Sequence, residues 1–167
     1  MGTALVVYES MWGNTEKVAR AVADGLASTL KVEVCEVRDA PASPTADVEL
    51  IVAGGPTHAF SMTRASTRQE ARRQGADHGG DTGLREWLDS LPSGEHPQPV
   101  ATFDTRVEKM RHVPGSAAKS AARVAHRHGY ERAAAAESFY VTDIDGPLID
   151  GELERASAWG RHIAASI

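Results

Sequence analysis

The sequence has few of the residues that would tie it to a disulfide scaffold, a metal cluster or a membrane. Its 167 residues include one cysteine, Cys35, so an internal disulfide and a site with several cysteine ligands are both excluded. No uninterrupted apolar run is long enough to cross a bilayer. No secretory leader is recognisable before the first apolar run, so the cytoplasm is the expected location.

Three nucleotide-binding or relay signatures are also missing. There is no G-x-x-x-x-G-K-[ST] phosphate loop and no G-x-G-x-x-G after the first apolar run. A phosphorelay receiver needs an aspartate after the third strand, where this chain has Ala53-Gly54-Gly55. His126 and His128 are two residues apart and do not share a helix face, so no metal site is expected.

The overall composition is that of an ordinary globular protein. Apolar residues make up 41% and charged residues 25%, and the length fits a single domain over residues 1–167. A net charge of −5 argues against general nucleic-acid binding.

Strand-like and helix-like stretches alternate along the whole chain, which predicts a parallel sheet with helices on both faces. Strands are expected at Thr3–Tyr8, Lys31–Val37, Asp47–Gly54, Val100–Phe103 and Glu137–Thr142. Helices are expected at Thr15–Leu30, Thr63–Gln74, Leu84–Leu91, Gly115–His128 and Gly151–Ile167. Asp104–Pro114 is expected to be a polar loop, and Asp150 to cap the last helix.

The first strand is followed by the most informative stretch of the sequence. An apolar run, Ala4–Tyr8, leads into a polar loop that contains Gly13, and a helical pattern begins directly afterwards. A helix N-terminus at this place offers backbone N–H groups and a positive dipole end to an anion. Ser10, Asn14 and Thr15 add side-chain donors, so the stretch predicts a phosphate-binding loop.

The residues Ser10-Met11-Trp12-Gly13-Asn14-Thr15 resemble the phosphate loop of flavodoxins. The resemblance continues in the strand order and in the Gly-Gly-Pro-Thr loop that ends at Thr57. It implies a flavodoxin-like α/β three-layer sandwich with a five-stranded parallel sheet of order 2-1-3-4-5. It also implies FMN as the cofactor, held at the carboxyl ends of the strands.

The resemblance also implies a role for each of three loops. The first loop would bind the FMN phosphate, and its residues are Ser10, Met11, Trp12, Gly13, Asn14 and Thr15. The second would line one side of the flavin ring, with Pro56, Thr57, His58, Ala59 and Phe60. The third would approach the pyrimidine end of the ring, with Asp104, Thr105 and Arg106. His58 is the candidate catalytic residue, either as a proton donor near flavin N5 or as a stacking ring.

The sequence departs from the flavodoxin pattern in its loops and in its charges. Met11 and Trp12 stand where the family usually has hydroxyls, and the usual stacking aromatics of the second and third loops are absent, which predicts a more open flavin site. Basic residues surround the expected site, namely Arg64, Arg68, Arg72, Arg73, Arg106, Lys109, Arg111, Lys119 and Arg123. A guanidinium at Arg106 is expected to favour the negatively charged, fully reduced flavin.

These features favour an FMN-binding electron-transfer protein that serves a redox partner protein or a small acceptor. One alternative is an enzyme on the same fold, either an FMN-dependent NAD(P)H:quinone reductase or an oxidase of the protoporphyrinogen type. Another alternative is a flavin-free module, or one that binds an anionic deazaflavin. The oligomeric state has no signature in the sequence.

Overall fold

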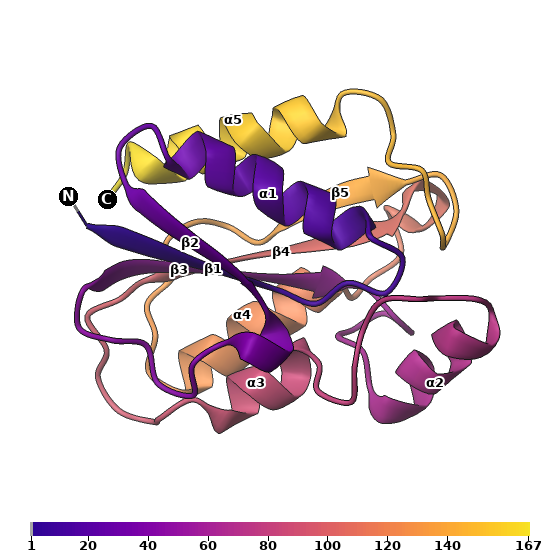
Figure 1. Ribbon diagram of the computed structural model, residues 1–167, viewed down its shortest axis with the longest axis horizontal. Coiled ribbons are helices and arrows are strands. Elements are labelled where there is room, and N and C mark those ends of the chain that lie inside the picture. The colour runs from indigo at the N-terminus through magenta and orange to yellow at the C-terminus, as the bar shows by residue number, and fades with distance from the viewer. Residues whose placement is uncertain (1) are drawn as a thin grey trace.

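The computed structural model describes residues 2–167, which form one five-stranded parallel sheet (Figure 1). The strands are β1 (Thr3–Tyr8), β2 (Lys31–Glu36), β3 (Val48–Pro56), β4 (Val100–Val107) and β5 (Glu137–Val141). Their order is β2-β1-β3-β4-β5, and every neighbouring pair is parallel. The predicted flavodoxin-like fold class is therefore confirmed.

Helices cover both faces of the sheet, and a further helix lies beyond the carboxyl ends of the strands (Figure 1). The helices are α1 (Asn14–Leu26), α2 (Ala65–Arg73), α3 (Leu84–Ser90), α4 (Ala117–Arg127) and α5 (Glu152–Ala164). Helices α1 and α5 pack on one face, and α3 and α4 pack on the other. Helix α2 lies near the carboxyl ends of the strands, and none of the helices formed by residues 2–167 combines the length and hydropathy needed to cross a bilayer.

The continuous apolar run of β1 is explained by burial on both of its faces. Val6 and Tyr8 belong to the apolar cluster under α1 and α5, whereas Leu5 and Val7 belong to the cluster under α3 and α4. Alternate side chains of a strand point to opposite faces, so a strand covered by helices on both sides is apolar at every position.

The prediction that β4 ends at Phe103, and that a loop begins at Asp104, is wrong. Strand β4 continues to Val107, and its last residues pair with β5 from Phe103↔Glu137 to Val107↔Val141. The polar side chains of this extension are buried, and each finds internal partners, as the carboxylate of Asp104 does with the backbone N–H of Ala118 at 2.9 Å. Polar residues therefore extend β4 to the carboxyl ends of the strands, where the three loops predicted to bind the cofactor are located.

The prediction that Asp150 caps the last helix is also wrong. The N-cap of α5 is Gly151, whose φ of 89° and ψ of −9° lie in the left-handed region, and no side chain caps this helix. Helix α1 begins in the same way, at Gly13 with φ 92° and ψ −10°. Both helices thus start from a backbone conformation that glycine adopts more readily than any other residue.

Candidate functional site: a phosphate loop and a hollow at the carboxyl edge of the sheet

The loop between β1 and α1 is folded around the hydroxyl of Ser10. The Ser10 oxygen accepts hydrogen bonds from the backbone N–H of Gly13 at 3.0 Å and of Glu16 at 3.4 Å. These bonds turn the chain toward the N-terminal end of α1, and the left-handed backbone conformation of Gly13 completes the turn. Ser10 therefore shapes the loop, and its own O–H hydrogen has no acceptor among the hydrogen bonds of residues 2–167.

Four backbone N–H groups of this loop remain available for a ligand. Within residues 2–167, no hydrogen bond uses the N–H of Met11, Trp12, Asn14 or Thr15. Unpaired N–H groups at a helix N-terminus, together with the positive end of the helix dipole, form an anion-binding site. The loop therefore presents several free backbone donors in one place, and phosphate binding by it stays a prediction.

The loop is tied to the sheet by the side chains at the start of α1. The hydroxyls of Thr15 and Thr105 are 2.7 Å apart in a buried hydrogen bond that joins α1 to β4. Asn14 packs against Gly146 in the connection after β5, where an added Cβ would lie 2.8 Å from the Asn14 amide nitrogen. The loop thus contacts both β4 and the connection after β5.

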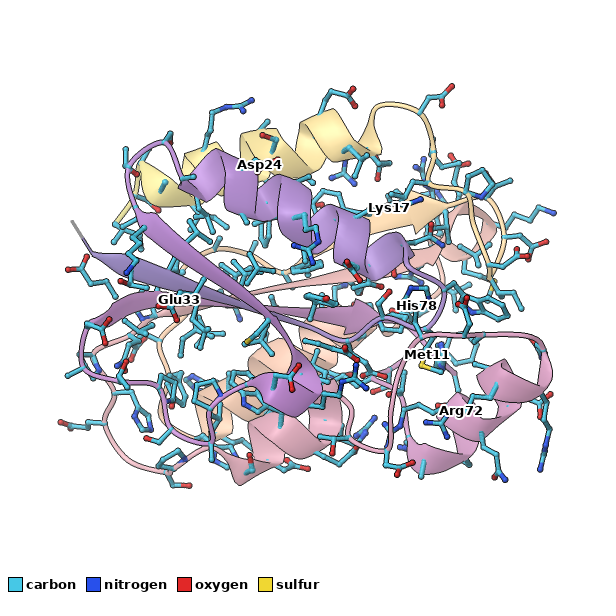
Figure 2. All side chains as sticks on the ribbon, in the orientation of Figure 1. Met11, Lys17, Asp24, Glu33, Arg72 and His78 are labelled. Carbon is cyan, nitrogen blue, oxygen red and sulfur yellow. The ribbon has the colours of Figure 1, made fainter. Side chains whose placement is uncertain are left out.

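The connection between α2 and α3 holds the loop from outside. The backbone N–H of His78 donates to the carbonyl oxygen of Met11 at 3.1 Å, and Figure 2 shows the two residues close together near the start of α1. The Met11 side chain is 1% exposed and its sulfur packs against Gly79. Met11 therefore anchors the loop to this connection.

A hollow lies beside the phosphate loop, between the ends of β3, β4 and β5. It contains about 420 Å³ of empty space, part of which is open to solvent. A second hollow beside α2 shares four of its lining residues, Trp12, Thr57, His58 and Ile144, so the two form one continuous depression.

Most of the residues predicted for the three loops line this hollow. Those that do so are Met11, Trp12, Asn14, Thr15, Pro56, Thr57, His58, Thr105 and Arg106. Ser10, Gly13, Ala59, Phe60 and Asp104 do not line it. Three residues that sequence reasoning did not select, Val107, Val141 and Ile144, complete the wall. Ile144 is an apolar residue between two aspartates, and that contrast is the one signal by which it could have been found.

Arg106 places a positive charge in the wall of the hollow. Its side chain is 8% exposed and donates to the carbonyl oxygens of Met110 and Val113, the latter at 3.1 Å. No carboxylate of residues 2–167 forms an ion pair with it, and its Nε has no hydrogen-bond partner among them. Burial raises the pKa of the neighbouring Asp104 carboxyl, although the bond from Ala118 opposes this shift.

His58 enters the hollow as a neutral ring at physiological pH. Burial, and to a smaller degree the positive charge of Arg68, lower its pKa from the ordinary value of 6.5. A neutral imidazole can stack on a ring or accept a proton, and it is a poor proton donor.

A buried polar network behind the hollow connects β1 to α2 and α3. The Glu9 carboxylate accepts hydrogen bonds from the Thr63 hydroxyl at 2.6 Å and from the Leu84 N–H at 2.8 Å. Arg68, which is 2% exposed, donates to the same hydroxyl at 2.8 Å and pairs with Glu86 at 2.6 Å. Arg68 is therefore not part of the basic rim in which the sequence places it.

In the part of the chain that the structure describes, no three His, Cys, Asp or Glu side chains gather in a group that could hold a metal ion.

Comparisons with known proteins agree with this arrangement. Residues 6–74 match the family model described as Flavodoxin. No curated protein sequence matches the chain. Among solved structures, oxidised flavodoxin 1 from Bacillus cereus superposes with a TM-score of 0.69 and 18% identity, over 99% of each chain.

Two further structures show how widely this fold is used. A flavodoxin from the domain Archaea is similar with a TM-score of 0.64 and 21% identity, over 98% of this chain and 96% of that chain. The rubredoxin oxygen:oxidoreductase of Desulfovibrio gigas matches 99% of this chain with a TM-score of 0.64 and 15% identity. Only 36% of that longer chain is covered. At such identities the likeness concerns the fold.

Proposed function

From the flavodoxin-like fold of this chain, we propose that it binds FMN and transfers electrons. The proposal rests on the backbone N–H groups of Met11, Trp12, Asn14 and Thr15, which no hydrogen bond among residues 2–167 uses. These groups suit the phosphate of FMN, because a dianion needs several donors in one place.

The hollow beside the loop fits the remainder of the cofactor. Trp12 and His58 offer flat rings and Ile144 offers an apolar edge, as a planar flavin ring requires. Thr15 and Thr105 fix the two walls relative to one another through their hydroxyl bond. When bound, FMN supplies the redox chemistry, while the chain orients it and sets the charge around it.

The first test compares FMN with riboflavin, which has the same ring system but no phosphate. We expect FMN to bind on the order of 100-fold more tightly, because each hydrogen bond to a charged group contributes ~1.5–3 kcal/mol. Binding is measured by flavin fluorescence quenching, and the FMN complex is then titrated potentiometrically. Equal affinity for the two flavins, or no binding of either, would contradict the proposal.

The chain offers a matched pair of variants for the same experiment. Gly13→Ala and Gly151→Ala each put a Cβ at a left-handed helix start with little around it, since the nearest atom to a Cβ at Gly13 is 3.7 Å away and none lies within 4 Å of one at Gly151. The backbone strain of ~1–2 kcal/mol is therefore similar at both positions. We expect Gly13→Ala to weaken FMN binding about tenfold, and Gly151→Ala to leave it unchanged.

A further inference from the structure

The turn that follows the second loop presents an exposed aromatic ring next to the hollow. His58 and Ser61 exchange backbone hydrogen bonds of 2.8 and 3.1 Å, and the two residues between them, Ala59 and Phe60, both have positive φ, at 48° and 66°. Asparagine and glycine are the usual residues of such a turn. Phe60 is 50% exposed, so neither burial nor a relaxed backbone explains its presence there.

The turn rests on the N-terminal end of α4. The N–H of Ala117 donates to the Thr57 hydroxyl at 2.9 Å, and the hydroxyls of Ser61 and Ser120 are bonded at 2.9 Å. Gly115 lies so close beneath the turn that an added Cβ would be 2.8 Å from the carbonyl oxygen of Phe60. Two segments far apart in the sequence therefore form one surface.

Both segments lack acidic residues. No aspartate or glutamate occurs from Thr57 to Gln69 or from Arg111 to Tyr130. Arg64, Lys119 and Arg123 are exposed on these segments, and no carboxylate of residues 2–167 forms an ion pair with any of them. A chain with a net charge of −5 thus has a cationic surface around Phe60, which we call the Phe60 face.

We propose that the Phe60 face is the docking surface for an acidic redox protein that exchanges electrons with the ligand of the hollow. Protein interfaces commonly have an aromatic residue at the centre and charged residues at the rim, which is the arrangement here. Thr57 and His58 belong both to the wall of the hollow and to the start of the turn, so a partner on this face comes close to the bound group. This assignment rests on the proposed function.

An acidic protein fits better than a nucleic acid. The net charge of −5 repels a long polyanion, whereas a small partner senses mainly the local field. Complementary charges at the rim accelerate association and make it depend on salt.

The test uses an acidic [2Fe–2S] ferredoxin as the probe and does not require flavin. We expect the amide NMR signals of residues 57–66 and 111–123 to shift at low salt, and the shifts to disappear at high salt. Lys119→Glu should weaken binding on the order of tenfold. It should still fold, because an acidic residue in the first turn of α4 complements the helix dipole.

Matched controls separate the local surface from the net charge. Lys31→Glu makes the same chemical change at the exposed start of β2, at the opposite end of the strands, and should leave binding unchanged. Phe60→Asn keeps a residue that tolerates positive φ and should weaken binding by removing the ring.

Each outcome has a defined meaning. Shifts elsewhere on the surface, an equal loss of binding in Lys31→Glu, or equal shifts with a short DNA duplex would overturn the inference. Flavin titration is performed separately, so a protein that binds the ferredoxin here but not FMN would refute the proposed function alone.

Discussion

At the scale of single residues, the site is set by polar side chains that are buried near its wall. Glu9 is 2% exposed and Asp104 is fully buried. Burial raises the pKa of both carboxyl groups, despite the hydrogen bonds that each accepts. These groups therefore hold their protons more tightly in the folded protein than in the unfolded chain.

This difference predicts how stability depends on pH. A carboxyl group whose pKa is raised by folding stabilises the folded state while it is protonated. For Glu9 this contribution to the free energy of unfolding is fully present below pH 4.5, the pKa in the unfolded chain, and it is lost as the pH rises through the pKa in the folded protein. Glu9→Gln should therefore lose less stability than the natural protein between pH 5 and pH 8, as measured by urea unfolding. Glu33→Gln, at an exposed position of β2 (Figure 2), is the control. Parallel pH profiles for Glu9→Gln and the natural protein would contradict this account.

Arg106 leads to a prediction about the redox potential of the bound flavin. Its guanidinium is buried in the wall of the hollow with no carboxylate paired to it among the described residues. Arg106→Gln keeps a donor for the Met110 carbonyl and removes the charge, so the potential should fall by tens of millivolts. Potentiometric titration measures this value, and Arg73→Gln on α2, exposed and paired with Glu70, should leave it unchanged.

At the scale of elements, helix α2 is joined to its neighbours through the buried side chain of Arg68. Arg68 bridges Thr63, the carbonyl oxygen of Asp81 and Glu86. An added Cβ at Gly83 would lie 2.8 Å from the Glu9 carboxylate and 2.9 Å from the Thr63 hydroxyl, so the network leaves no room for a side chain there. These contacts join α2 to the rest of the fold.

Removing Arg68 should therefore be strongly destabilising. Arg68→Ala leaves the Thr63 hydroxyl and the Asp81 carbonyl oxygen without a donor and removes the partner of the partly exposed Glu86, and a buried polar group left without a hydrogen bond costs ~1–3 kcal/mol. Arg73→Ala, on the same helix but exposed, should change the free energy of unfolding by less than ~0.5 kcal/mol. Urea unfolding measures the free energy of unfolding of both variants. Similar losses in the two would show that the Arg68 network does not stabilise the fold.

The elements could be predicted from the sequence, because the apolar runs and helical patterns are local, whereas the strand order was implied by the resemblance to flavodoxins. The extension of β4 could not, since Asp104 and Arg106 become compatible with a strand only through partners elsewhere in the chain. The phosphate loop can be recognised as a sequence motif. Ile144 lines the hollow only because the connection between β5 and α5 folds over it, and no local sequence pattern predicts that course. The roles assigned to the individual site residues remain predictions.

At the scale of the whole molecule, the features of the candidate site gather at one end of the sheet. The phosphate loop, the hollow and the Phe60 face all lie at the carboxyl ends of the strands, as expected for a parallel α/β sheet. Helices α1 and α5 are in close backbone contact near their C-terminal ends, away from the site, since an added Cβ at Gly25 would be 2.9 Å from the Arg161 nitrogen.

The bond between His78 and Met11 has a consequence for how quickly a ligand exchanges. A phosphate loop that opened outward would let its ligand leave through the loop itself. Here the connection after α2 is bonded to the outside of the loop, whereas Trp12 and Ile144 line both parts of the depression. If FMN binds as proposed, we expect its residence time to depend on the movement of these two side chains, while the loop itself stays closed.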